Sequence, residues 1–162
     1  MTLVAACLFR FAVIVFGYAV AAFAASAFLN LLSLGALDWG QEELPWVVAG
    51  SVMVTIPVVA LLIGYFAFIP AVPVILLAEM LARRDWLFYA IAGGMVAVVV
   101  VGYLWQASGP LSDAGFAGRN HGDPASLDAG FIMMMIGGGV VGGIAYWFAA
   151  GRWAGVKPDI AP

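Results

Sequence analysis

Charged residues are scarce in this sequence. Asp, Glu, Lys and Arg make up only 9% of its 162 residues, whereas 65% are hydrophobic and the mean hydropathy is +1.10. A soluble domain carries roughly 25% charged residues, which keep its surface polar. This chain has too few charges to cover a globular surface, so we expect it to lie in a lipid bilayer.

Cysteine and histidine are almost absent. The one cysteine, Cys7, has no partner in the chain for a disulfide or a redox pair. The one histidine, His121, excludes a haem held by two histidines and does not support a histidine-rich zinc site. With only six basic residues and a net charge of −3, the chain has no basic surface for nucleic acid. We therefore expect no cofactor, no metal and no nucleic-acid partner.

A polar stretch, residues 106–129, is rich in Gly, Ser and Asp. This composition cannot bury a core, so the sequence predicts a flexible loop. A metal site needs ligands at fixed spacing on rigid supports, which such a loop does not provide. The residues there that could in principle coordinate a cation are Asp113, Arg119, Asn120, His121, Asp123 and Asp128. The sequence also lacks a Ser-His-Asp set, paired carboxylates and a phosphate loop, so we expect no enzymatic activity.

Four apolar stretches are long enough to cross a membrane, whose hydrocarbon core of about 30 Å takes about 20 helical residues. They are residues 11–34, 46–82, 86–105 and 130–149. None shows the apolar and polar alternation of barrel strands. The sequence predicts an all-α, polytopic membrane protein with four transmembrane helices in a single domain, residues 1–162. A cleaved signal peptide is the alternative for the first stretch, but its start lacks charge and the apolar run continues to Leu34.

The second stretch is longer than one crossing needs. At 1.5 Å per residue, residues 46–82 would extend roughly 55 Å as a helix. Pro70 and Pro73 each remove a backbone donor, so we expect a kink there. Residues 74–82 would then form a tilted or interfacial half-helix. Pro57 is a second place where this helix could bend.

The basic residues are distributed unevenly between the two ends of the predicted helices. If both termini are cytoplasmic, only Arg119 lies outside, and the five others are inside: Arg10, Arg83, Arg84, Arg152 and Lys157. Cytoplasmic flanks of membrane helices are enriched in Lys and Arg. We therefore expect a multi-pass membrane protein with both termini in the cytoplasm.

Glycines are concentrated in the fourth predicted helix. The pairs Gly138/Gly142 and Gly139/Gly143 both have the GxxxG spacing, which lets another helix backbone approach closely. A matching set of small residues on the first helix consists of Gly17, Ala21 and Ala25. We expect this face to pack against a helix of the same chain or of another subunit.

Glu79 is the only acidic residue within an apolar run. An ionisable group at membrane depth is a candidate for binding or moving protons or cations. Arg83 lies one helical turn later, however, in the orientation that favours a helical ion pair. We expect a Glu79–Arg83 pair at the cytoplasmic interface, and expect Arg10 and Arg152 to anchor their helices by extending toward the headgroups.

Some segments resemble small uncharacterised four-helix inner-membrane proteins of alphaproteobacteria. The resemblance covers about a third of the chain: Leu76-Leu77-Ala78-Glu79 and the stretches 87–94 and 142–152. It implies four membrane helices in a bacterial inner membrane and no particular activity.

Two functions remain open from the sequence. One is a non-catalytic membrane protein acting by helix packing, as an accessory subunit of a membrane complex or as a homo-oligomer, whose partners are lipids, other membrane subunits or itself. The other is a small transporter or channel that uses Glu79 and the proline-broken second helix, since broken helices often line binding sites. Few polar groups could line its path: Glu79, Asn30, Ser51 and Thr55.

Overall fold

The computed structural model describes residues 3–36, 45–81, 84–112 and 129–153. These residues form four long α-helices and one 3-10 turn: α1 (Leu3–Ala36), α2 (Pro45–Met80), α3 (Trp86–Ser112), α4 (Ala129–Ala149) and η1 (Gly151–Trp153). Each long helix contains an apolar segment long enough to cross a membrane. The prediction of an all-α fold with four candidate membrane spans is therefore confirmed.

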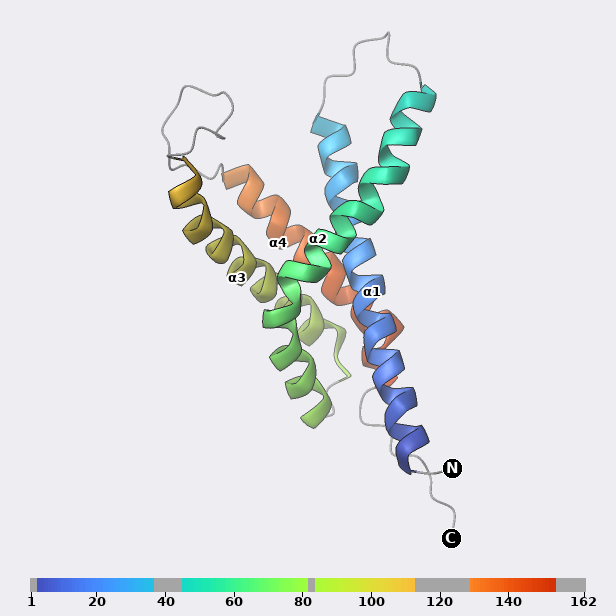
Figure 1. Cartoon of the computed structure of the whole chain (residues 1–162). Helices are drawn as coiled ribbons and strands as arrows, with labels where there is room; N and C mark the ends of the chain where they lie inside the picture. Colours follow the sequence, from blue (N-terminus) through green and yellow to red (C-terminus); the bar gives the residue numbers. More distant parts are fainter. Residues whose placement is uncertain (1–2, 37–44, 82–83, 113–128, 154–162) are drawn as a thin grey trace.

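Successive helices run in opposite directions, as Figure 1 shows. The start of α1, the end of α2, the start of α3 and the end of α4 consequently lie together at one end of the bundle. The most extensive packing joins α4 to α3 and α4 to α1, followed by α1 with α2. α2 contacts α3 much less. The centre of the bundle is thus α4, with α1 and α3 on either side of it.

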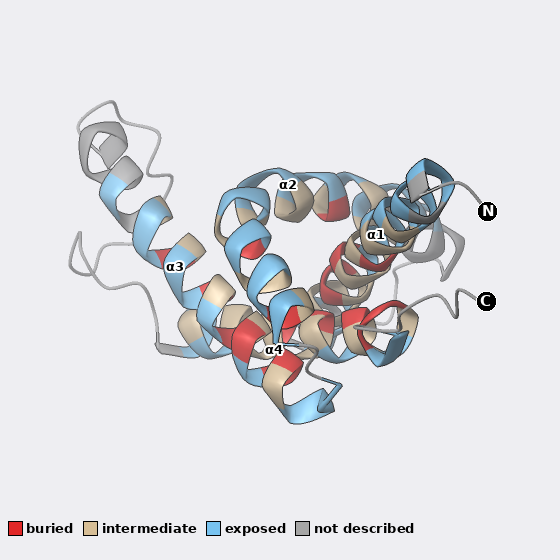
Figure 2. Cartoon of the chain, turned by 90° about the horizontal axis from the view of Figure 1, so that it is seen from below, coloured by how far each residue is buried: buried red, intermediate tan, exposed pale blue. Residues whose placement is uncertain are grey.

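The buried side chains of the bundle are mostly small. Seen along the bundle, the buried positions lie on the inner faces of the helices and the outer faces are exposed (Figure 2). Alanine dominates the interior: Ala22, Ala25, Ala60, Ala71, Ala78, Ala90, Ala92, Ala97 and Ala150 are all buried. Leu, Phe, Met and Ile side chains are largely on the outside, where the surrounding solvent would be lipid. Such an arrangement is typical of membrane helices, whose interfaces favour small residues.

Two helices are longer than predicted. α1 begins at Leu3 and includes Arg10, although the sequence prediction started this helix at residue 11. α3 continues to Ser112, so residues 106–112 are helical and the prediction of a loop there is wrong. Gln106 and Ala107 are good helix formers, and the helix continues through Gly109 and Pro110 to Ser112. The remaining residues of the predicted loop, 113–128, lie outside the described part of the chain.

α2 remains one continuous helix through all three of its prolines, Pro57, Pro70 and Pro73. Its axis changes direction partway along the helix (Figure 1), so α2 is bent, as the prolines predict, without being interrupted. Each proline lacks the amide hydrogen that would bond to the carbonyl one turn earlier. Membrane helices tolerate this loss because neighbouring helices and local adjustments satisfy the freed groups.

Candidate functional site

Every charged residue in the part of the chain that the structure describes lies at one end of the bundle. These residues are Arg10, Glu79, Arg84, Asp85 and Arg152. Three are basic and two are acidic, and they come from α1, α2, the turn before α3, and η1. The opposite ends of the four described helices carry no charged residue. We call this charged region the Arg10 end.

Arg10 and Glu79 form an ion pair that joins α1 to α2. The Nε atom of Arg10 donates to Oε2 of Glu79 at 3.1 Å, and Nη2 donates to the same oxygen. Nη1 also donates to the carbonyl oxygen of Trp153 at 3.3 Å, which ties η1 to the pair. The two side chains are 33% and 23% exposed, so the pair is partly shielded.

This pairing was not foreseen from the sequence, which had left Arg10 as an unpaired anchor. Glu79 was expected to pair with Arg83, which lies outside the described residues, so that contact stays a prediction. Arg10 and Glu79 are far apart in the chain. Only the antiparallel packing of α1 and α2 brings them together.

Two buried tyrosines, Tyr89 of α3 and Tyr146 of α4, stand next to the ion pair. Their ring centroids are 5.6 Å apart, and both pack with the buried Ala78 and Ala150. Together with Arg10 and Glu79, each of the four helices contributes one polar side chain to this end of the bundle. A further tie comes from Trp147, whose Nε1 donates to the carbonyl oxygen of Arg84 at 2.6 Å. At the Arg10 end, an ion pair and hydrogen bonds thus connect α1, α2, α4, η1 and the turn before α3.

The α1–α2 contact carries further hydrogen bonds along its length. Tyr18 donates its hydroxyl to the carbonyl oxygen of Gly64 at 2.6 Å. Ser26, which is fully buried, donates to the carbonyl oxygen of Ile56 at 2.7 Å. Arg10, Tyr18 and Ser26 are each separated by eight residues, about 12 Å along α1, and all three bond to α2. We call these three ties the polar seam, and they hold α2 to α1 through the depth of the membrane.

The glycines of α4 face two different helices. A Cβ atom added at Gly139 would collide with the carbonyl oxygen of Gly93 in α3, and one at Gly143 with that of Tyr89. A Cβ atom at Gly142 would lie 3.1 Å from the carbonyl oxygen of Ala21 in α1. The other predicted packing residues lie in the same α1–α4 contact: Gly138 faces Leu29, Ala25 faces Gly142, and Gly17 faces Tyr146 and Ala150. α4 is therefore glycine-lined toward both of its neighbours within this chain.

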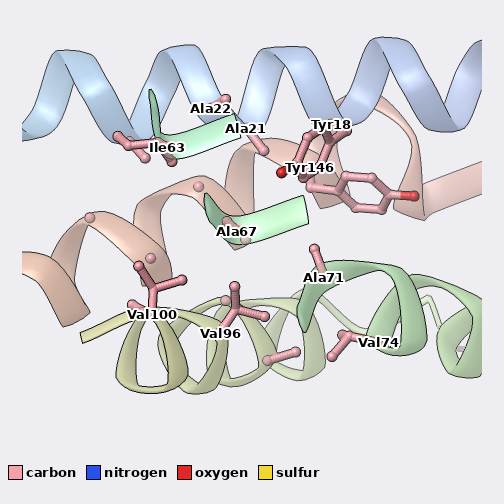
Figure 3. Close-up of a pocket in the computed structure, with 18 of the residues that line it drawn as sticks. Tyr18, Ala21, Ala22, Ile63, Ala67, Ala71, Val74, Val96, Val100 and Tyr146 are labelled. Atoms are coloured by element: carbon pink, nitrogen blue, oxygen red, sulfur yellow. The ribbon is translucent and has the colours of Figure 1, made fainter. Parts of the chain in front are cut away.

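A cavity of about 140 Å³ lies inside the bundle (Figure 3). All four helices line it, and its walls are almost entirely carbon. On α2 the lining includes Ala67 and Ala71, which point toward the glycine-rich part of α4. Tyr18 and Tyr146 lie at one side of it. The cavity arises because small residues of α2 and of α4 face each other without filling the space between them.

The inner face of α2 was not recognised from the sequence. Its small residues Ala60, Gly64, Ala67, Ala71 and Ala78 are separated by four, three, four and seven positions, the spacing of one face of a packed helix. Hydropathy does not reveal this pattern because alanine and leucine both count as apolar. A search for small residues at this spacing would have found the face.

The polar residues expected within the bundle are dispersed. Asn30 donates to the carbonyl oxygen of Ser26 at 2.9 Å, within α1. Thr55 is exposed on α2, and the side chain of Ser51 lies outside what the structure describes. Among the described residues, no group of three or more His, Cys, Asp or Glu side chains could hold a metal ion.

Comparison with known proteins identifies no relative of this chain. No protein-family model, no curated protein and no solved structure matches this chain. The resemblance to small inner-membrane proteins therefore stays an expectation, and the function has to be argued from the bundle itself.

Proposed function

We propose that this protein is a non-catalytic integral membrane protein that acts by helix packing, as an accessory subunit of a membrane complex or as a homo-oligomer. The observation that carries the proposal is the position of Tyr65 on the outer face of α2. This side chain is 76% exposed, close to the middle of the candidate span Val52–Met80. Its hydroxyl makes no hydrogen bond to the described part of the chain.

A hydroxyl facing hydrocarbon is unfavourable. Transfer of such a group into an apolar medium without a hydrogen bond costs on the order of 1–3 kcal/mol by protein mutational data. Membrane proteins place tyrosine by preference at the headgroup level, where the hydroxyl stays wet. Tyr65 therefore supports contact between α2 and another membrane helix that supplies an acceptor.

The rest of α2 agrees with such a contact. Of the four candidate spans, α2 buries the smallest share of its most apolar segment. Its alanines face inward, and large side chains such as Leu61, Phe68 and Ile69 face outward. The outer face of α2 is thus broad and largely apolar, and Tyr65 places a hydroxyl near the middle of its span.

Site-specific crosslinking tests the proposal. A photoreactive phenylalanine analogue at position 65 should give one discrete protein adduct in the native membrane, either with a second copy or with another subunit. The matched control is the same analogue at Phe16, a 64% exposed position on the outer face of α1, which should label lipid alone. Lipid labelling alone at both positions would contradict the proposal.

The transporter alternative has weaker support from the geometry. Glu79 lies at the Arg10 end with its charge paired, and α2 continues as a helix through Pro70 and Pro73. Tyr18 and Ser26 of α1 bond to α2, and Asn30 bonds within α1, so these polar side chains do not converge on a path. We therefore keep helix packing as the proposed function.

The proposal includes the orientation inferred from the basic residues. All three basic residues in the described part of the chain, Arg10, Arg84 and Arg152, lie at the Arg10 end. The other described helix ends carry no basic residue. We place the Arg10 end in the cytoplasm of a bacterial cell, because cytoplasmic flanks are rich in Lys and Arg.

A further inference from the structure

The cavity between α2 and α4 is a feature that the proposed function leaves unused. Its volume of about 140 Å³ is close to that of an engineered 150 Å³ apolar cavity that binds benzene or xenon. On that scale the space has room for about six carbon atoms. Empty space of this size removes packing contacts from every residue around it.

Water is a poor occupant for this cavity. A buried water needs two to four polar partners, whereas the lining is almost entirely carbon. The hydroxyl of Tyr18, which lines the cavity, is already used in the bond to the carbonyl oxygen of Gly64. No charged side chain lines the cavity, so it does not suit an ion.

The cavity has a route to the surrounding lipid. Among neighbouring long helices, α2 and α3 make the fewest contacts. Val74 of α2 and Val96 and Val100 of α3 line the cavity and are only half-buried (Figure 3). An apolar chain in the bilayer can therefore approach between these two helices.

We propose that this cavity holds a segment of one phospholipid acyl chain. The lining matches an uncharged, purely apolar ligand, and acyl chains are the solvent that surrounds the helices at this depth. The headgroup stays outside the bundle, so the site recognises the chain and not the charge of the lipid. The bound chain supplies the contacts that the small residues of α2 and α4 do not make with each other.

The test fills the cavity from one wall. Ala67→Leu places three more carbon atoms in the space, and Ala19→Leu makes the same change on the exposed face of α1 as the matched control. Each full-length protein is reconstituted in phosphatidylcholine and, separately, in phosphatidylglycerol. After extraction in mild detergent, native mass spectrometry counts the phospholipids that stay bound.

The wild type and Ala19→Leu should each retain one phospholipid from either membrane, and Ala67→Leu should retain at least tenfold less. Equal retention by Ala67→Leu and the wild type would overturn the proposal, as would retention by neither. So would retention of phosphatidylglycerol alone, because the headgroup would then be recognised. An apolar molecule of another class that the wild type binds and Ala67→Leu does not would overturn the assignment to phospholipid.

Thermal stability provides a second measurement. A ligand that binds only the folded state stabilises it, so added phospholipid should raise the Tm of delipidated wild type and of Ala19→Leu. The same addition should leave the Tm of Ala67→Leu unchanged, because leucine occupies the site. If Ala67→Leu does not fold, Ala67→Val adds two carbon atoms at the same position and should show a smaller lipid-dependent rise than Ala19→Leu. A rise equal to that of the control would overturn the proposal.

Discussion

At the scale of single residues, the decisive contact is the ion pair between Arg10 and Glu79. A lone charge near the hydrocarbon is costly, whereas a pair with further hydrogen bonds reduces that cost. Here one carboxylate oxygen accepts two bonds from the guanidinium, and the carbonyl of Trp153 accepts a third. Removal of either partner leaves the other charge partly buried and uncompensated. The loss of one partner should therefore destabilise the protein more than the loss of both.

We predict that Glu79→Gln and Arg10→Gln each lower the free energy of unfolding by about 1–3 kcal/mol, between the values for exposed and fully buried pairs. The double variant should cost less than the sum, because the two side chains interact directly. Thermal unfolding in detergent measures all three. Arg83→Gln is the control: if it destabilises as much as Arg10→Gln, then Glu79 depends on Arg83 as the sequence had suggested.

At the scale of helices, the sequence was most informative about where they lie and least about how they meet. Hydropathy predicts four spans, because apolar runs of about 20 residues are rare in proteins except in membrane-spanning helices. It misplaced the start of α1 because Arg10 was treated as a boundary, although its long stem allows it to lie within the helix. The inner face of α2 escaped notice because Ala67 and Leu61 are equally apolar. Which helices are neighbours is a property of the assembled bundle, so the Arg10–Glu79 pair could not be predicted.

The polar seam leads to a prediction for the α1–α2 contact. Tyr18→Phe and Ser26→Ala each remove one interhelical donor while keeping most of the side-chain volume. Hydrogen bonds between membrane helices contribute about 0.6 kcal/mol on average, so each variant should lose roughly that amount in a detergent unfolding measurement. The two sites are eight residues apart, about 12 Å along the helix, so the losses should add. A double variant as stable as the wild type would contradict a stabilising seam.

The glycine contacts of α4 lead to a sharper prediction. Gly143→Ala places a methyl group against the carbonyl oxygen of Tyr89, where neither backbone can move easily. We expect a loss of about 1–3 kcal/mol, as for other overpacked sites. Gly102→Ala is the matched control, because a Cβ atom there has nothing within 4 Å. Equal thermal stability of the two variants would show that α3 and α4 are less closely packed than described.

At the scale of the whole molecule, charge separates the two ends of the bundle. The described charged residues lie at the Arg10 end, and the apolar spans extend away from it. Such asymmetry orients membrane proteins during insertion, because basic flanks stay in the cytoplasm. We therefore expect the bundle to insert with its Arg10 end in the cytoplasm, even though its helices alternate in direction.

Reporter fusions test this orientation. A reporter active only in the periplasm should be inactive when fused after Arg84 or Pro162, and active when fused after Leu37 or Gly118. A reporter active only in the cytoplasm should give the reverse pattern. Periplasmic activity at Arg84 would mean that the basic residues do not set the orientation of this protein.

The central position of α4 has a consequence for the order in which the molecule can assemble. α4 is the last of the four helices to leave the ribosome, yet its glycine faces make the two most extensive contacts in the bundle. Before it arrives, α1 and α2 can join through the polar seam, but α3 has only its sparse contact with α2. Close packing of the bundle therefore has to wait until α4 has been synthesised. A chain cut short before α4 would leave small-residue faces of α1 and α3 open in the membrane, available to any other helix that fits them.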